Sequence, residues 1–154
     1  MLHAIDADTH LFESAQVWDF IDEEMYPRRP IIVSGPGDTV YRRSSFWLID
    51  GTIFPKSAGK GGFLLGTPTE PGQRETTPDV RARELLDIAG RLQAMDVMGV
   101  ATQVVYPTLF LAYITDDVKL EVALCRSYNR FMAGVWEQRP GTPEVGGSAT
   151  SQVD

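Results

Sequence analysis

Three side chains that can bind a metal ion fall at every second residue near the start of the chain. They are Asp6, Asp8 and His10, within Ile5-Asp6-Ala7-Asp8-Thr9-His10. Side chains two apart on a strand point the same way, so all three would project from one face if the strand extends that far. Carboxylate and imidazole groups so placed can bind a divalent cation such as zinc or manganese.

A metal-free turn is the alternative for this motif, because Asp is also common in turns. A catalytic zinc site needs about three protein ligands. The only other histidine of the chain is His3. Taken alone, the motif therefore favours the metal-free interpretation, and the chain does not supply an obvious complete metal shell.

Residues 4–8 are expected to form a strand that leads through a loop into a helix over 14–24. Ser14 can cap that helix, and its apolar stripe would comprise Val17, Trp18, Phe20 and Ile21. From Pro78 a second helical pattern begins, and Gly99 suits the left-handed stop at its end. The apolar stripe of this helix consists of Leu85, Ile88, Leu92 and Met95, with Arg81, Arg83, Asp87 and Arg91 on other faces.

Residues 100–106 read as an apolar strand that Pro107 closes. Thr115 or Asp116 can then cap a long helix. Its stripe is formed by Leu120, Ala123, Leu124, Tyr128, Phe131 and Val135. The order strand, helix, strand, helix is typical of a parallel α/β unit.

The segment 27–79 interrupts this pattern, since it contains seven of the ten prolines and eight of the fourteen glycines. Within it, Asp50-Gly51 separates two β-prone triplets and predicts a hairpin over 47–54. The stretch Gly59-Lys60-Gly61-Gly62 lacks the features of a phosphate-binding loop and reads as a flexible loop. The tail, 139–154, is expected to be disordered or loosely draped.

Bulk composition limits the classes of function. The formal net charge of −7 leaves no basic stripe for nucleic acid. Cys125 is the single cysteine, which excludes an internal disulfide and fits a reducing compartment. No stretch approaches the roughly 18 apolar residues that a membrane span needs. The expected protein is cytoplasmic and binds neither nucleic acid nor membrane.

Three blocks carry a resemblance to a known family. They are Ile5 to Glu13, Arg91 to Thr108, and Cys125 to Val135 with Ser127-Tyr128-Asn129-Arg130-Phe131. In this order they resemble the first strand, the helix-to-second-strand passage and the following helix of the amidohydrolase-2 family. This is a branch of metal-dependent (β/α)-barrel hydrolases and decarboxylases related to aminocarboxymuconate semialdehyde decarboxylase. The resemblance spans residues 4–138 and matches the insertion at 27–79 loosely.

The resemblance implies an α/β fold, an incomplete (β/α)₈ TIM barrel with its first two to three βα units and a Pro/Gly-rich hairpin insertion. Asp8 and His10 take the positions of two metal ligands, with zinc or manganese as the expected cofactor. Asp8 departs from the commoner histidine, which leaves the metal undecided. Glu13 matches an acidic residue that often follows, without an assigned role. The implied reaction is hydrolysis of a C–N or C–O bond or decarboxylation of a small acid.

The active sites of such barrels form at the carboxyl ends of the strands. Tyr106 and Thr108 therefore qualify as substrate-binding residues, although packing at the strand end is an equal alternative. Arg42 and Arg43 can attract a carboxylate, but surface solvation is the favoured interpretation. Cys125 is expected to be a buried thiol rather than a nucleophile.

A complete barrel of this kind typically has about 250 residues. The sequence therefore reads as a first barrel part, 1–138, followed by a tail that a shifted reading frame would explain. The catalytic His and Asp of the family belong to later strands, so weak metal binding and little turnover are expected of this chain alone. The full enzyme would act on a small molecule and can be a homo-oligomer. The alternatives are a short α/β interaction module and a non-functional truncated product.

Overall fold

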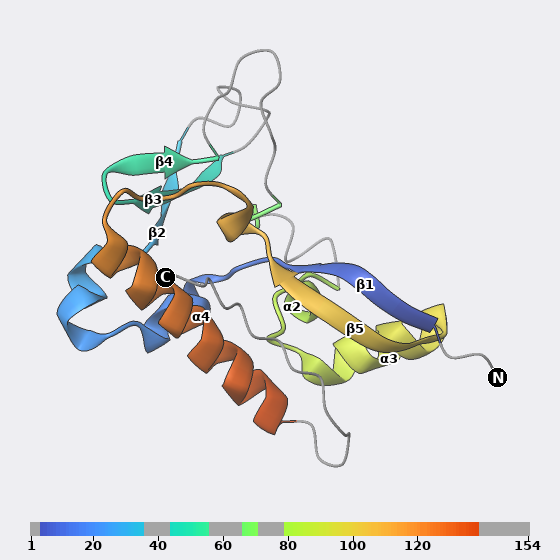
Figure 1. Ribbon diagram of the computed structural model, residues 1–154. Helices are drawn as coiled ribbons and strands as arrows, with labels where there is room; N and C mark the ends of the chain where they lie inside the picture. Colours follow the sequence, from blue (N-terminus) through green and yellow to red (C-terminus); the bar gives the residue numbers. More distant parts are fainter. Residues whose placement is uncertain (1–3, 36–43, 56–65, 71–78, 139–154) are drawn as a thin grey trace.

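The structure is a computed structural model that describes residues 4–35, 44–55, 66–70 and 79–138. The described residues form two small sheets, α-helices and short 3₁₀ turns (η), and Figure 1 shows how the strands and α-helices are arranged. In chain order the elements are β1 (Ala4–Leu11), η1 (Ala15–Phe20), η2 (Glu23–Arg28), β2 (Ile31–Ser34), β3 (Ser45–Ile49), β4 (Thr52–Phe54), α2 (Val80–Arg83), α3 (Ile88–Met98), β5 (Val100–Pro107), η3 (Leu109–Leu111) and α4 (Val118–Glu137).

The strands β1 and β5 pair in parallel and confirm the two predicted strands. Gly99 ends α3 in the left-handed conformation, with φ 70°, and reverses the chain into β5 as predicted. Figure 1 shows α3 running beside this strand pair. The fold is therefore mixed α/β, with a two-stranded parallel sheet and a separate antiparallel sheet, and the described residues form no closed barrel.

The predicted hairpin is confirmed within the insertion at 27–79. Strand β3 pairs antiparallel with both β2 and β4. Asp50 and Gly51 join β3 to β4 with φ of 49° and 75°, the pair of positive angles that the Asp-Gly dipeptide predicts. Trp47 and Ile49 on the inner face of β3 are fully buried. This sheet therefore packs onto the main core of the chain.

The predicted helix over 14–24 is wrong, because η1 and η2 form two 3₁₀ turns with extended backbone between them. Carbonyl oxygens that an α-helix would use internally accept hydrogen bonds from α4 instead. The Ser127 hydroxyl donates to the Val17 carbonyl at 2.7 Å, and Arg130 donates to the Phe20 carbonyl at 2.8 Å. Tertiary hydrogen bonds thus replace the helical ones.

The single helix predicted from Pro78 is also wrong, since the chain breaks between α2 and α3. Leu85 adopts a positive φ of 53°. The N–H groups of Leu86 and Asp87 both donate to the Arg81 carbonyl, which closes the turn. Asp87 then caps α3 by accepting from Gly90 N at 2.9 Å.

The long helix α4 has the predicted stripe, and all six residues of that stripe are buried. Its N-cap is Asp117 rather than Thr115 or Asp116. The Asp117 carboxylate accepts from Lys119 N and Leu120 N. Arg28 joins this cap to the hairpin, since it contacts Asp117 and Asp50 at 2.6 Å each.

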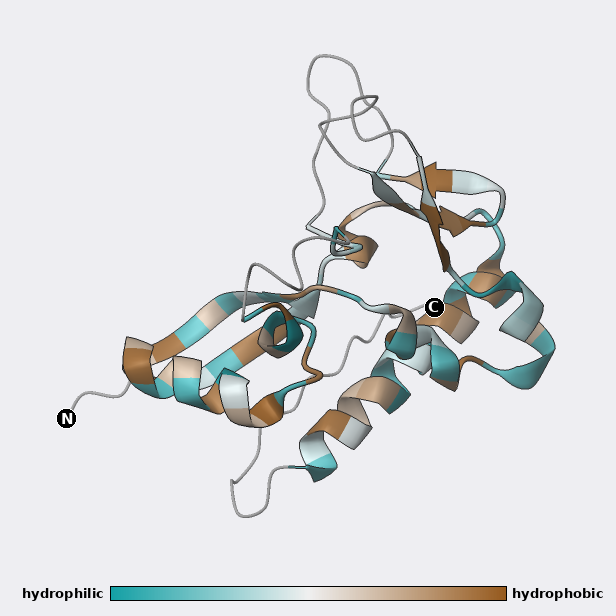
Figure 2. Ribbon diagram, turned by 180° about the vertical axis from the view of Figure 1, so that it is seen from behind, coloured by the Kyte–Doolittle hydropathy of each residue, from teal (hydrophilic) through white to brown (hydrophobic). Residues whose placement is uncertain are grey.

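The core lies where η1, the hairpin and α4 meet. Figure 2 shows apolar and polar residues alternating along the helices, with apolar strands in the antiparallel sheet. Among the described residues, the largest fully buried apolar side chains are those of Trp18, Trp47, Phe54, Leu11, Ile49, Leu109, Leu120, Leu124 and Val17. No helix among the described residues has the length and apolarity to cross a membrane. Gly59 to Gly62, Arg42, Arg43 and the tail 139–154 lie outside the described residues.

Candidate metal centre

An irregularity in β1 separates Asp6 from the other two candidate ligands. Between Asp6 and Thr9 the strand advances three residues, while β5 advances two, from Gln103 to Val105. The extra residue breaks the alternation of side chains. Asp6 and Thr9 therefore share one face, where the Thr9 hydroxyl donates to the Asp6 carboxylate. The expectation that Asp6, Asp8 and His10 share a face is wrong.

Asp8 and His10 do lie together, near the carboxyl end of β1. His10 Nε2 is 3.5 Å from Asp8 Oδ1. Two ligands at about 2.1 Å from a tetrahedral zinc ion are about 3.4 Å apart, so this spacing is compatible with shared coordination. The Asp8 side chain is 92% exposed and that of His10 is 29% exposed. A cation can therefore reach both groups from solvent.

A cavity of about 310 Å³ adjoins these two side chains. Tyr106 lies opposite His10 in the strand register, with the two ring centroids 6.0 Å apart. The remaining wall comes from Pro107, Phe110 and Leu111. The structure thus brings Tyr106 together with Asp8 and His10, beside a largely apolar wall that could hold a small molecule.

Thr108 does not line this cavity. It is buried, and its hydroxyl donates to the Leu11 carbonyl at 2.6 Å. This hydrogen bond joins the ends of β1 and β5. The placement corresponds to the strand-end packing that was the alternative for this residue.

Glu13 connects the two loops that follow β1 and β5. Its fully buried Oε1 accepts from Thr108 N at 2.7 Å and from Leu109 N at 2.9 Å. Burial raises the pKa of this carboxyl from 4.5 to about 7, and the backbone donors oppose that change. Glu13 Oε2 and the hydroxyl of Tyr128 are buried without a hydrogen-bond partner among the described residues. Burial, together with the Glu13 charge, raises the pKa of Tyr128.

The role of Glu13 as a link between loops was not predicted. The family resemblance only aligned Glu13 with an acidic residue that often follows the first-strand motif. No local pattern signals such a role, because Thr108 and Leu109 are more than ninety residues away along the chain.

The described residues do not supply a complete metal shell. They contain no group of three His, Cys, Asp or Glu side chains that could hold an ion together. His10 Nδ1 is buried without a hydrogen-bond partner in this part of the chain. A metal-binding histidine usually donates from its second nitrogen to an acceptor that orients the ring. The described residues thus offer two candidate ligands, without the groups that would orient them and complete a metal shell.

Arg91 is another residue that the sequence misplaced. It was expected on a face of the helix other than the apolar stripe, but it is half-buried and donates from Nε to Gln103 Oε1 at 2.8 Å. A signal was present, because Arg91 follows Ile88 by three residues and precedes Met95 by four. Those spacings place it at the edge of the apolar stripe. Cys125 is half-buried, and burial raises the pKa of its thiol.

Comparison with known proteins yielded no match to this chain, either among protein-family models or among curated proteins.

Proposed function

We propose that residues 4–138 form the first βα units of a metal-dependent enzyme of the amidohydrolase-2 type. The observation that supports this most is the pairing of Asp8 and His10, 3.5 Å apart, beside Tyr106 at the carboxyl ends of two parallel strands. Ligand sites of parallel α/β folds lie at this edge. Zinc or manganese is the expected ion, because the donors are one carboxylate oxygen and one imidazole nitrogen.

Bound there, the ion would supply a Lewis acid for hydrolysis of a C–N or C–O bond or for decarboxylation of a small acid. Asp8 and His10 would bind it, and the Asp8 charge would offset part of the charge of the cation. Tyr106, Phe110 and Leu111 would provide an apolar wall for a small-molecule substrate. The acid/base residue and the remaining ligands would come from beyond the described residues.

A metal titration tests this proposal. With two ligands, the 154-residue chain is expected to bind Zn²⁺ or Mn²⁺ weakly and to lose it on dialysis. H10A and D8N are each expected to weaken binding at least about tenfold, because even the loss of a group that orients a ligand costs about that much. Isothermal titration calorimetry on the dialysed protein at pH 7 measures the affinity.

Two control variants make the titration specific. H3A removes the only other histidine, and D96N removes an exposed carboxylate of α3. Both should bind the metal as the wild type does. Equal affinity in H10A and the wild type would refute the assignment of His10. Stoichiometric metal that survives dialysis would contradict the weak-binding expectation.

The second candidate is a short α/β module that binds another protein. It is favoured by the exposure of the parallel pair, in which Ile5 is 69% and Tyr106 is 45% exposed. Parallel sheets are normally covered on both faces. An incomplete barrel is expected to self-associate through such surfaces and to show little protection from hydrogen exchange. Light scattering and exchange measurements that find a protected monomer would favour the module instead.

A further inference from the structure

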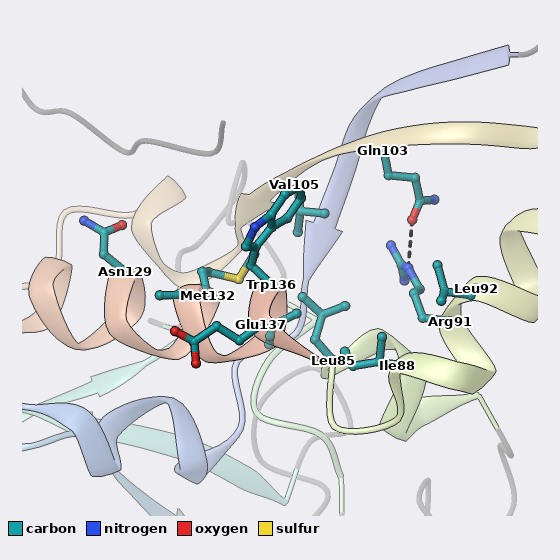
Figure 3. Close-up of a pocket in the computed structure, with 12 residues that line it drawn as sticks. Leu85, Ile88, Arg91, Leu92, Gln103, Val105, Asn129, Met132, Trp136 and Glu137 are labelled. Carbon is teal, nitrogen blue, oxygen red and sulfur yellow. Dashed lines mark hydrogen bonds between the residues drawn. The ribbon is translucent and has the colours of Figure 1, made fainter. Parts of the chain in front are cut away.

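A second cavity, of about 370 Å³, lies between α3, β5 and the C-terminal half of α4. Figure 3 shows its lining, in which Trp136 and Met132 of α4 lie near Val105 of β5. Leu85, Ile88 and Leu92 complete the apolar wall. Gln103 and Val105, two residues apart on β5, both line this cavity, so their side chains lie on one face of the strand. Tyr106, the next residue after Val105, lies on the other face and lines the candidate metal centre. The two cavities therefore lie on opposite faces of the strand pair.

The cavity exists because α4 packs mainly against η1, not against β5. Figure 1 shows α4 set apart from the β1 and β5 pair. Ile88 and Leu92, which the sequence placed in a core stripe, are consequently only half-buried. Apolar side chains in such a position gain free energy if an apolar ligand removes them from water.

The positively charged guanidinium of Arg91 lies at one end of the cavity. Arg91 Nε donates to Gln103 Oε1 at 2.8 Å, and Gln103 Nε2 donates to Asp6 Oδ2 at 3.1 Å. This chain of hydrogen bonds holds the guanidinium at the cavity wall. Its two Nη groups have no hydrogen-bond or ion-pair partner among the described residues.

The environment of Arg91 favours an anion. Burial lowers the pKa of the guanidinium, while the nearby Asp6 carboxylate opposes this. A negative group placed near such a guanidinium favours its charged form. Glu137 also lines the cavity, but Figure 3 shows its carboxylate directed away from Arg91. The Arg91 end is thus the side at which a negative group can bind.

We propose that this cavity binds a small amphipathic monocarboxylate, with its carboxylate on the Arg91 Nη groups and its apolar part between Val105, Met132 and Trp136. The planar guanidinium matches a carboxylate through two parallel hydrogen bonds. A volume of about 370 Å³ lies within the usual range for small-ligand sites. A single arginine in a chain of net charge −7 suits one negative charge better than several. This proposal does not depend on the metal centre.

Octanoate and 1-octanol form a matched pair of probes, because they share a chain length and differ in the charged group. Titrations of the metal-free protein are followed by NMR, through the amide signals of Gln103 and the indole N–H of Trp136. Octanoate is expected to bind at least about tenfold more tightly than 1-octanol, the gain of a charge-assisted hydrogen bond. The largest shifts are expected at the cavity residues.

Substitution of Arg91 provides the decisive variant. R91Q should lose the preference for octanoate and still bind 1-octanol, which also shows that the cavity remains folded. R91K keeps the charge without the planar fork and should retain part of the preference. K119Q removes an exposed cation of α4, outside the cavity, and should behave as the wild type. Equal binding of the two probes by the wild type, an unchanged preference in R91Q, or shifts outside the cavity would each overturn the proposal.

Discussion

Replacement of Glu13 by glutamine is expected to remove a loss of stability that the wild type shows as the pH rises from about 4.5 to about 7. Glu13 is fully buried, and burial raises the pKa of its carboxyl in the folded state from 4.5 to about 7. Between these values the unfolded chain ionises while the folded chain stays protonated. The folded state then binds more protons than the unfolded state, so stability falls with rising pH.

The expected loss is about 3 kcal/mol, the free energy that corresponds to this change in pKa. The stabilising contribution of the protonated form is fully present below about pH 4.5 and is lost once the pH exceeds about 7. In E13Q the amide oxygen can still accept from Thr108 N and Leu109 N. The glutamine variant should therefore match the wild type at low pH and exceed it above pH 7.

Urea unfolding of both proteins between pH 4 and 8 measures this effect, and the difference between the two curves cancels the other titrating groups. E121Q, which removes an exposed carboxyl of α4, controls for the loss of one negative charge. Parallel curves for E13Q and the wild type across this range would show that folding does not raise the pKa of Glu13. The hairpin and the strand-end loops would then have to accommodate a buried carboxylate.

W47A is expected to lower the free energy of unfolding by about 4 kcal/mol, the cost of removing a fully buried tryptophan from a core. Trp47 is fully buried in β3, and its ring meets Trp18 edge-on at 6.0 Å. Its Nε1 donates to Thr67 Oγ1 at 3.0 Å, and that hydroxyl donates to the Glu13 carbonyl at 2.7 Å. The variant thus opens a cavity and also detaches the hairpin from the loop after β1.

W47F separates these two contributions. Phenylalanine retains most of the ring contact with Trp18 but cannot donate to Thr67, so a smaller cost of about 1–2 kcal/mol is expected. I53A, on the neighbouring strand β4, truncates a side chain that is 51% exposed and should cost little. If denaturant unfolding gave similar values for W47A and I53A, the insertion would not be part of the main core.

Local physical chemistry accounts for the elements that were predicted well. The Asp50-Gly51 turn depends on two positive φ angles, and these residue types adopt them at low cost. The end of α3 at Gly99 and the buried stripe of α4 depend on residue type and helical period alone. The pairing of Asp8 with His10 follows from a spacing of two residues on an extended strand.

Other features depend on partners far away in the chain. Residues 14–24 have a helical pattern, but side chains of α4 donate hydrogen bonds to backbone carbonyl groups of this segment. The separation of Asp6 from Asp8 depends on the register between β1 and β5. None of these contacts has a signature within a short window of sequence.

Local patterns in the sequence were sufficient to predict β1, β5, the β3–β4 hairpin, the long helix α4 and the adjacent pair Asp8 and His10, because each follows from local backbone preference or from a short period, whereas β2 was not predicted. The three-dimensional packing was needed to show that Glu13 joins two strand-end loops and that Arg91 faces a cavity beside Gln103. The physical reason is that burial and long-range hydrogen bonds arise from packing, and packing depends on residues that are distant in the chain.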